Sequence, residues 1–180
     1  MNSLVVIEDN RGKVHRMSKE AIVGAQKLGG DVFALVIGEN ASSLSSDLSS
    51  LQLTQILVVE DDLVSTYNAD GYSEVVSQIV KLMNINIIIA GHTYQTRDYM
   101  PRVSAKLDIP FISDIIGIDQ DLYIKQVLNA KLNSSISCST SSRILSFQSA
   151  CFSEDDIING TTEVKNIDVN LDSSLVRSTS

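Results

Sequence analysis

The sequence predicts an α/β fold, a three-layer Rossmann-like domain whose mostly parallel sheet carries added antiparallel strands near its C-terminal end. Strand-like and helix-like segments alternate four times over residues 3–107, which is the pattern of successive βα units. The strand-like runs are continuously apolar, as in strands that helices cover on both faces. After residue 118, short apolar runs follow one another without a helical segment, which is typical of antiparallel hairpins.

The first half of the chain supplies the expected parallel core. Each apolar run ends at a turn, and each is followed by a segment with apolar residues at helical spacing. Gly29 and Gly30 provide the stop expected at a helix C-terminus, whereas the Ser-rich second helix has only middling helix propensity. We expect strands at 3–8, 32–37, 55–60 and 85–90, and helices at 18–28, 41–51, 72–83 and 96–107.

Residues 87–118 form the most informative stretch, reading IIIAGHTYQTRDYMPRVSAKLDIPFISDIIGI. A buried-strand run stops at Gly91, a polar loop and a helix follow, and a second apolar run completes the stretch. About thirty residues of strand, helix and strand match the size of one βαβ unit. We expect Pro101 in the first turn of the helix, or at a short break near it.

The last third of the chain should extend the sheet. We expect strands at 112–118, 122–128, 133–138 and 143–147, arranged as antiparallel hairpins at one end, and one more strand at 164–169. The second half of the low-complexity stretch 133–142 is predicted to be an exposed hairpin loop. The expected domain is therefore 1–169, with 170–180 as a linker or frayed tail.

Composition limits the function classes. The 180 residues carry 14 basic and 22 acidic side chains, a formal net charge of -8, so binding of nucleic acid is not expected, although a local basic site is compatible with this charge. Cys138 and Cys151 form neither a CxxC nor a zinc pattern, which indicates reduced thiols in a cytosol-like compartment. No apolar run approaches the roughly 20 residues of a membrane span, so we expect no membrane insertion.

The familiar nucleotide and catalytic motifs are missing from the sequence. The loop after the first strand, residues 8–12, is acidic and has one glycine, so it should repel a phosphate rather than hold it. The sequence has no GxGxxG, no Walker motif and no GxSxG. We assign no catalytic, cofactor-binding or metal-ligating residue on these grounds.

The two histidines are weak candidates. His15 follows a turn and is expected on the surface. His92 leaves the carboxyl end of a strand, where open α/β sheets place their ligands. We interpret it as a loop histidine that caps neighbouring backbone, with a ligand-binding role as the alternative.

A second set of candidates flanks the helix at 96–107. Arg97 and Asp98 can contact a partner, or belong with a locally paired Arg102 to a solvated helix entrance. Ser113 and Asp114 can hydrogen-bond backbone at the start of a strand. A buried Asp114 would need a partner, so its expected role is structural or interfacial.

The motif PRVSAKLDI at 101–109, followed by ISDIIGI at 112–118, closely resembles the alpha subunit of electron transfer flavoprotein. The opening strand with Glu8, the AQKLGGDV segment at 25–32 and the VIGEN segment at 36–40 resemble the N-terminal portion of the same subunit. The resemblance covers about residues 3–152 and is carried chiefly by the first motif pair.

The resemblance implies a carrier with non-covalent FAD, built from an alpha and a beta subunit. Such a carrier accepts electrons from dehydrogenases and passes them to a membrane quinone oxidoreductase. Most FAD contacts in the family come from a C-terminal part of the alpha subunit, which we expect to lie outside this chain. The expected role is therefore a structural and subunit-interface domain, without FAD of its own and without enzymatic chemistry.

The chain departs from the family pattern in its expected antiparallel part. Lys125 stands where the family often has Arg, Leu128-Asn129-Ala130-Lys131 replaces Tyr-Ala-Gly-Asn, and Phe147-Gln148-Ser149-Ala150 replaces Val-Arg-Gly-Thr. A change from Arg to Gln removes a fixed charge and a bidentate donor. These departures weaken the expectation of a partner contact there.

A stand-alone module that binds an adenine nucleotide at the carboxyl ends of the strands is the alternative function. The family's fold is shared with such binders, and the carrier's beta subunit holds AMP. The acidic first loop opposes this alternative. The expected location is the cytoplasm of a bacterium, or the mitochondrial matrix if a leader was removed.

Overall fold

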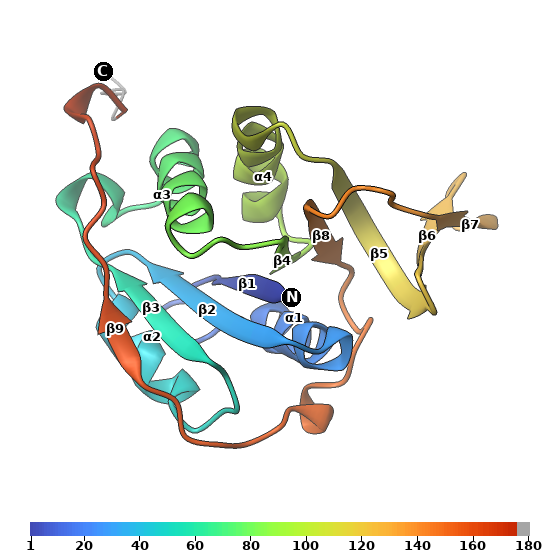
Figure 1. The fold of residues 1–180 in the computed structure, drawn as a ribbon, viewed down its shortest axis with the longest axis horizontal. Coiled ribbons are helices and arrows are strands. Elements are labelled where there is room, and N and C mark those ends of the chain that lie inside the picture. Colours follow the sequence, from blue (N-terminus) through green and yellow to red (C-terminus); the bar gives the residue numbers. More distant parts are fainter. Residues whose placement is uncertain (176–180) are drawn as a thin grey trace.

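The computed structural model describes residues 1–175, which form one mixed sheet with helices on both faces (Figure 1). The sheet is 9-stranded, in the order β7-β6-β5-β8-β4-β1-β2-β3-β9. The strands are β1 Asn2–Ile7, β2 Asp31–Ile37, β3 Gln55–Val59, β4 Ile87–Gly91, β5 Phe111–Asp119, β6 Leu122–Val127, β7 Leu132–Ile136, β8 Arg143–Phe147 and β9 Val164–Asn166. The helices are α1 Arg16–Leu28, α2 Ala41–Leu48, α3 Ala69–Leu82 and α4 Tyr94–Leu107, with short 3-10 helices at Asp62–Val64, Glu154–Asp156 and Ser173–Leu175.

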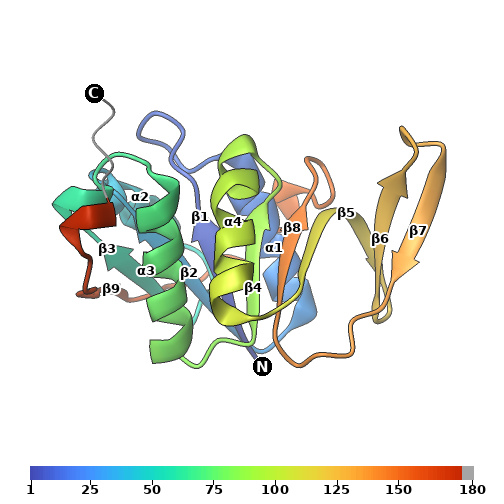
Figure 2. The ribbon, with the colours of Figure 1, turned by 90° about the horizontal axis from the view of Figure 1, so that it is seen from above.

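The two faces of the sheet bury separate aliphatic cores. Neighbouring residues of β1 alternate between them, with Val5 in the core under α1 and α2 and Leu4 in the core under α3 and α4. Both side chains are fully buried, because every central strand is covered on both sides (Figures 1 and 2). The three-layer, mostly parallel fold expected from the continuous apolar runs is confirmed.

The placement of β8 corrects the predicted hairpin arrangement. Arg143–Phe147 does not pair antiparallel at the end of the sheet; it lies between β4 and β5 and is parallel to both. Ile144 packs in one core and Leu145 in the other, so the strand is a central one. Consequently β4 and β5 do not pair directly, and the expected βαβ unit passes over an intervening strand.

β5, β6 and β7 form an antiparallel arm that extends from the body of the domain (Figure 2). The turn between β6 and β7 contains Leu128, Asn129 and Ala130, all with positive φ. The hairpin loop predicted in the second half of 133–142 is wrong. The mostly exposed segment 137–142 instead connects β7 to β8, which lies in the centre of the sheet. The predicted antiparallel addition holds for these three strands.

Capping residues shift the helix starts from their predicted positions. Thr93 accepts a hydrogen bond from the Thr96 N–H at 3.1 Å, so α4 begins at Tyr94. Pro101 consequently lies inside the helix and not in its first turn, which corrects the prediction. Asn68 caps α3 in the same way, through the Gly71 N–H at 2.6 Å.

The chain after β8 returns along the sheet to its other edge. Thr162 is buried, and its hydroxyl donates to the Leu51 carbonyl at 2.6 Å and accepts from the Leu53 N–H at 3.0 Å. These bonds lead into β9, which pairs parallel with β3 and is shorter than the strand expected at 164–169. Of the predicted tail 170–180, residues 176–180 lie outside the described part. Within residues 1–175, none of the helices has the length and apolar character needed to span a bilayer.

Candidate functional site

The main hollow of interest lies at the carboxyl ends of β1 and β4. In the sheet β1 and β4 are neighbours, and the connection after β1 leads to β2 on one side whereas the connection after β4 leads to β5 on the other. Open α/β sheets bind ligands at such a switch point. The hollow has a volume of about 430 Å³ and is lined by Glu8, His15, Met17, His92, Thr93, Tyr94, Gln95 and Arg97.

Glu8 and His15 bring the first loop into this hollow. The Glu8 carboxylate accepts a hydrogen bond from the Thr93 hydroxyl, and the Glu8 carbonyl accepts from the His15 N–H at 2.9 Å. His15 Nδ1 in turn accepts from the Met17 N–H at 3.1 Å and caps α1. His15 is therefore half-buried and part of the hollow, and not simply on the surface as expected.

His92 is held by β8 on one side and faces β5 on the other. Its Nδ1 lies 2.9 Å from the Ser146 hydroxyl, and its Nε2 lies 3.9 Å from the Asp114 carboxylate. Burial lowers the pKa of His92; Asp114 opposes this shift, while Arg97 and Lys125 add to it. The imidazole bonds a side chain and does not cap backbone, which corrects the structural interpretation made from the sequence.

A second hollow of about 500 Å³ adjoins the first and shares His92 and Arg97 with it; its remaining lining residues are Pro101, Phe111, Ser113, Asp114 and Lys125. Asp114 lies at an irregularity in the pairing of β5 with β8 and has a φ of 62°. It is half-exposed and lies within the strand, not at its start as expected. The irregularity directs this carboxylate toward His92.

Ser146 and Lys125 complete this region, and the sequence did not single out either as a neighbour of His92. Ser146 is fully buried, and its hydroxyl also accepts from the Asp114 N–H at 3.2 Å. The sequence feature that could have pointed to Ser146 is its position as a hydroxyl residue within a largely apolar strand. Lys125 comes from the adjacent antiparallel strand, a placement that required the sheet order.

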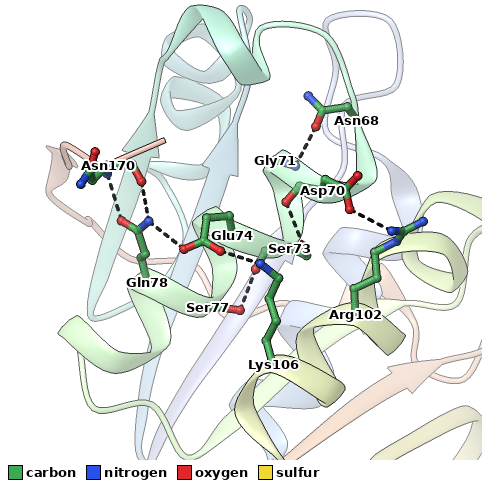
Figure 3. A network of polar contacts seen from close by, with 10 residues as sticks. All are labelled: Asn68, Asp70, Gly71, Ser73, Glu74, Ser77, Gln78, Arg102, Lys106 and Asn170. Atoms are coloured by element: carbon green, nitrogen blue, oxygen red, sulfur yellow. Dashed lines mark hydrogen bonds and ion pairs between the residues drawn. The ribbon is translucent and has the colours of Figure 1, made fainter. Parts of the chain in front are cut away.

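Arg102 and Asp98 lie apart from both hollows. Arg102 Nη1 contacts Asp70 of α3 at 2.8 Å, and its Nη2 lies 3.8 Å from Asp98. Asp98 also accepts from the Tyr67 hydroxyl at 2.8 Å. Figure 3 shows the cross-helix pair of Arg102 beside that of Lys106 with Glu74. Arg102 thus pairs locally, as predicted, and also joins two helices.

The contact between Ser146 and His92 is not open to a substrate. Ser146 is closed to solvent, so its contact with His92 cannot present a nucleophile to a substrate. Among residues 1–175, no group of three or more His, Cys, Asp or Glu side chains is placed to hold a metal ion. The arrangement instead presents two imidazoles, fixed charges and an open surface.

Residues 3–172 match the protein family described as the electron transfer flavoprotein domain. The chain belongs to this family. The family predicted from the PRVSAKLDI and ISDIIGI motifs is therefore confirmed.

Several relatives are named electron transfer flavoprotein subunit alpha. The protein from Bacillus subtilis is 33% identical over 117 residues, which cover 64% of this chain and 36% of the relative. The one from Thermoanaerobacterium thermosaccharolyticum is 30% identical over 143 residues, covering 74% and 43%. A probable mitochondrial alpha subunit from Cryptococcus neoformans is 26% identical over 178 residues, covering 94% and 51%. The chain thus spans between about a third and a half of these relatives.

The family implies a flavin in the full-length subunit, but the residues of the switch-point hollow do not fit FAD. A dinucleotide pyrophosphate needs close approach to backbone N–H groups at a glycine-rich turn. Here Glu8 presents a carboxylate to the hollow, and the nearby Gly91 is packed so that an added Cβ would meet Met17 Cβ at 2.6 Å. The glycine serves helix packing, so it leaves no room for a bound phosphate.

Proposed function

We propose that this chain is the structural and subunit-interface domain of the alpha subunit of a flavin electron carrier. The carrier moves electrons from dehydrogenases to a membrane quinone oxidoreductase. Two observations carry this proposal: residues 3–172 match the electron transfer flavoprotein domain, and the relatives reported above are named alpha subunits, of which the chain covers about a third to a half.

In this proposal the flavin performs the redox chemistry, because cofactor enzymes and carriers use the protein for binding, orientation and electrostatics. FAD belongs to the part of the alpha subunit that this chain does not match. The domain positions that part and packs against the beta subunit. The Glu8 carboxylate in the switch-point hollow supports this division, since it disfavours a phosphate there.

Flavin retention tests the proposed division of labour. The purified chain is mixed with excess FAD, passed through gel filtration and examined for visible flavin absorbance in the protein peak. We expect none, while a full-length alpha subunit assembled with its beta subunit should retain the colour. Stoichiometric FAD on the isolated chain would contradict the assignment of the cofactor to another part.

A binding module for an adenine nucleotide is the second candidate, favoured by one observation, the hollow of about 430 Å³ at the switch point. Calorimetry with AMP and ATP separates the candidates. The interface proposal predicts no heat of binding at micromolar nucleotide. Micromolar affinity that the Glu8→Gln substitution strengthens would favour the nucleotide module, because the substitution removes the opposing carboxylate.

A further inference from the structure

The second hollow gathers two cations, and neither forms an ion pair with a carboxylate of residues 1–175. Arg97 comes from the first turn of α4 and lies 5.6 Å from the centre of the Tyr94 ring. Lys125 comes from β6, and its Nζ donates to the Ser113 hydroxyl at 3.2 Å. The other cations of α4 behave differently: Arg102 is paired with carboxylates, and so is Lys106.

His92 and Asp114 set the charge between these cations. The His92 ring is held through Nδ1 by the buried Ser146 hydroxyl, and its Nε2 edge lies 3.9 Å from Asp114. Two cations and one carboxylate leave a local charge of about +1 while His92 is neutral, and about +2 when it is protonated. This excess lies in a chain whose formal net charge is -8.

We propose that this hollow binds a phosphoryl group, held by Arg97 and Lys125 and joined by His92 when that ring is protonated. A phosphate monoester carries a charge of about −1.5 to −2 near neutral pH, so it can use two cations at once, whereas a carboxylate carries one charge. Pro101 and Phe111 provide an apolar wall for the body that bears the phosphate. The bound group is a small phosphorylated molecule.

This site adjoins the nucleotide alternative at the switch point and shares His92 and Arg97 with it, but its other lining residues differ. Glu8 lines the first hollow and is not among the residues of the second. A phosphate beside Lys125 therefore avoids the carboxylate that opposes one beside β1. The proposal goes beyond the carrier role, because it concerns a ligand that the electron-transfer reaction does not require.

Inorganic phosphate is the probe for the test, with chloride at matched ionic strength as the reference, because surface charges are screened by salt. The chain contains 2 histidines, so proton NMR follows both imidazoles, with a His15→Gln variant to assign them. Bound phosphate favours the charged ring, so we expect the pKa of His92 to rise with phosphate concentration. The chemical shifts of the His15 ring should change much less when phosphate is added.

Four variants make the test specific. Arg97→Gln and Lys125→Gln should each weaken phosphate binding about tenfold, the loss typical of one charge-assisted hydrogen bond. At a pH where His92 is neutral, Asp114→Asn should strengthen binding several-fold, because it removes the opposing charge without changing the charge of the ring. Asn tolerates the positive φ of this residue, and a gain of affinity cannot arise from misfolding. Lys131→Gln, on the exposed turn of the arm, should leave binding unchanged.

The proposal is overturned if phosphate leaves the His92 titration unchanged, or if Asp114→Asn gives no gain in affinity. It is also overturned if Lys131→Gln weakens binding as much as Lys125→Gln, since the effect would then be general. Acetate acting as strongly as phosphate would contradict the phosphoryl group as the ligand.

Discussion

At the scale of single residues, a close contact between α1 and β4 explains why residue 91 is a glycine. Gly91 ends β4 at the point where α1 crosses it. A Cβ added there would lie 2.6 Å from Met17 Cβ and 3.2 Å from the Met17 carbonyl oxygen. Because backbone atoms cannot move aside as a flexible side chain does, this contact sets the distance between helix and sheet.

Gly91→Ala should therefore destabilise the domain by about 1–3 kcal/mol, the usual range for overpacking in a well-packed core. Gly117→Ala is the matched control, because an added Cβ on that β5 residue meets no atom within 4 Å. Thermal unfolding should show a lower Tm for the first variant, by about 2–4 °C per kcal/mol, and little change for the second. Equal Tm values would show that the helix can shift without penalty.

The residues near the hollows also show what the sequence could reveal. It placed His92 correctly at the carboxyl end of a strand, because a continuous apolar run defined that strand. It could not pair His92 with Ser146 or Asp114, because those contacts depend on β8 lying between β4 and β5. The cap formed by His15 was equally hidden, since histidine is outside the usual set of N-cap residues.

At the scale of elements, ion pairs on the surface of the domain join α3 and α4. Lys106 of α4 contacts Glu74 of α3, which also accepts from Gln78 at 3.0 Å (Figure 3). The hydrogen bond from Lys106, followed by that from Gln78, lowers the pKa of Glu74 below its ordinary value of 4.5. A carboxylate with a lowered pKa in the folded state stabilises the fold above the unfolded-state pKa and loses that contribution as pH falls through the folded-state pKa.

The variant Glu74→Gln should consequently be less stable than the natural sequence at pH 7, by at most about 1 kcal/mol for a pair this exposed. Urea unfolding at a series of pH values should show the difference shrinking as the pH falls below 4.5 and disappearing once Glu74 is protonated in the folded state as well. Ser134→Ala, on the distant arm, serves as a control with no titrating group. A stability difference that stays constant down to low pH would contradict an electrostatic origin.

The sequence predicted the helices and strands better than it predicted which strands lie next to each other in the sheet. Each of the four helices and the parallel strands followed from apolar periodicity, with boundary shifts where Thr93 and Asn68 form caps. The position of β8 was missed because short spacing resembles a hairpin, although its largely apolar composition also fits a central strand. Strand order depends on long-range packing, which local periodicity does not record.

At the scale of the whole molecule, the domain combines a two-sided parallel core with an arm that extends from one edge (Figures 1 and 2). The arm exposes Leu128 and Leu132 to 68% and 57%, and it carries Lys125 and Leu128, two of the departures from the family pattern. Family membership followed from the sequence because its motifs lie in the α4 and β5 framework.

Complex formation with the beta subunit tests the central claim most directly. The chain is co-expressed with the beta subunit of its own organism, and the purified material is analysed by gel filtration with light scattering. An unrelated α/β domain of similar charge is the control partner. The interface role predicts a one-to-one complex that survives gel filtration and carries no FAD on this chain. Separate elution of the two proteins at micromolar concentration would contradict it.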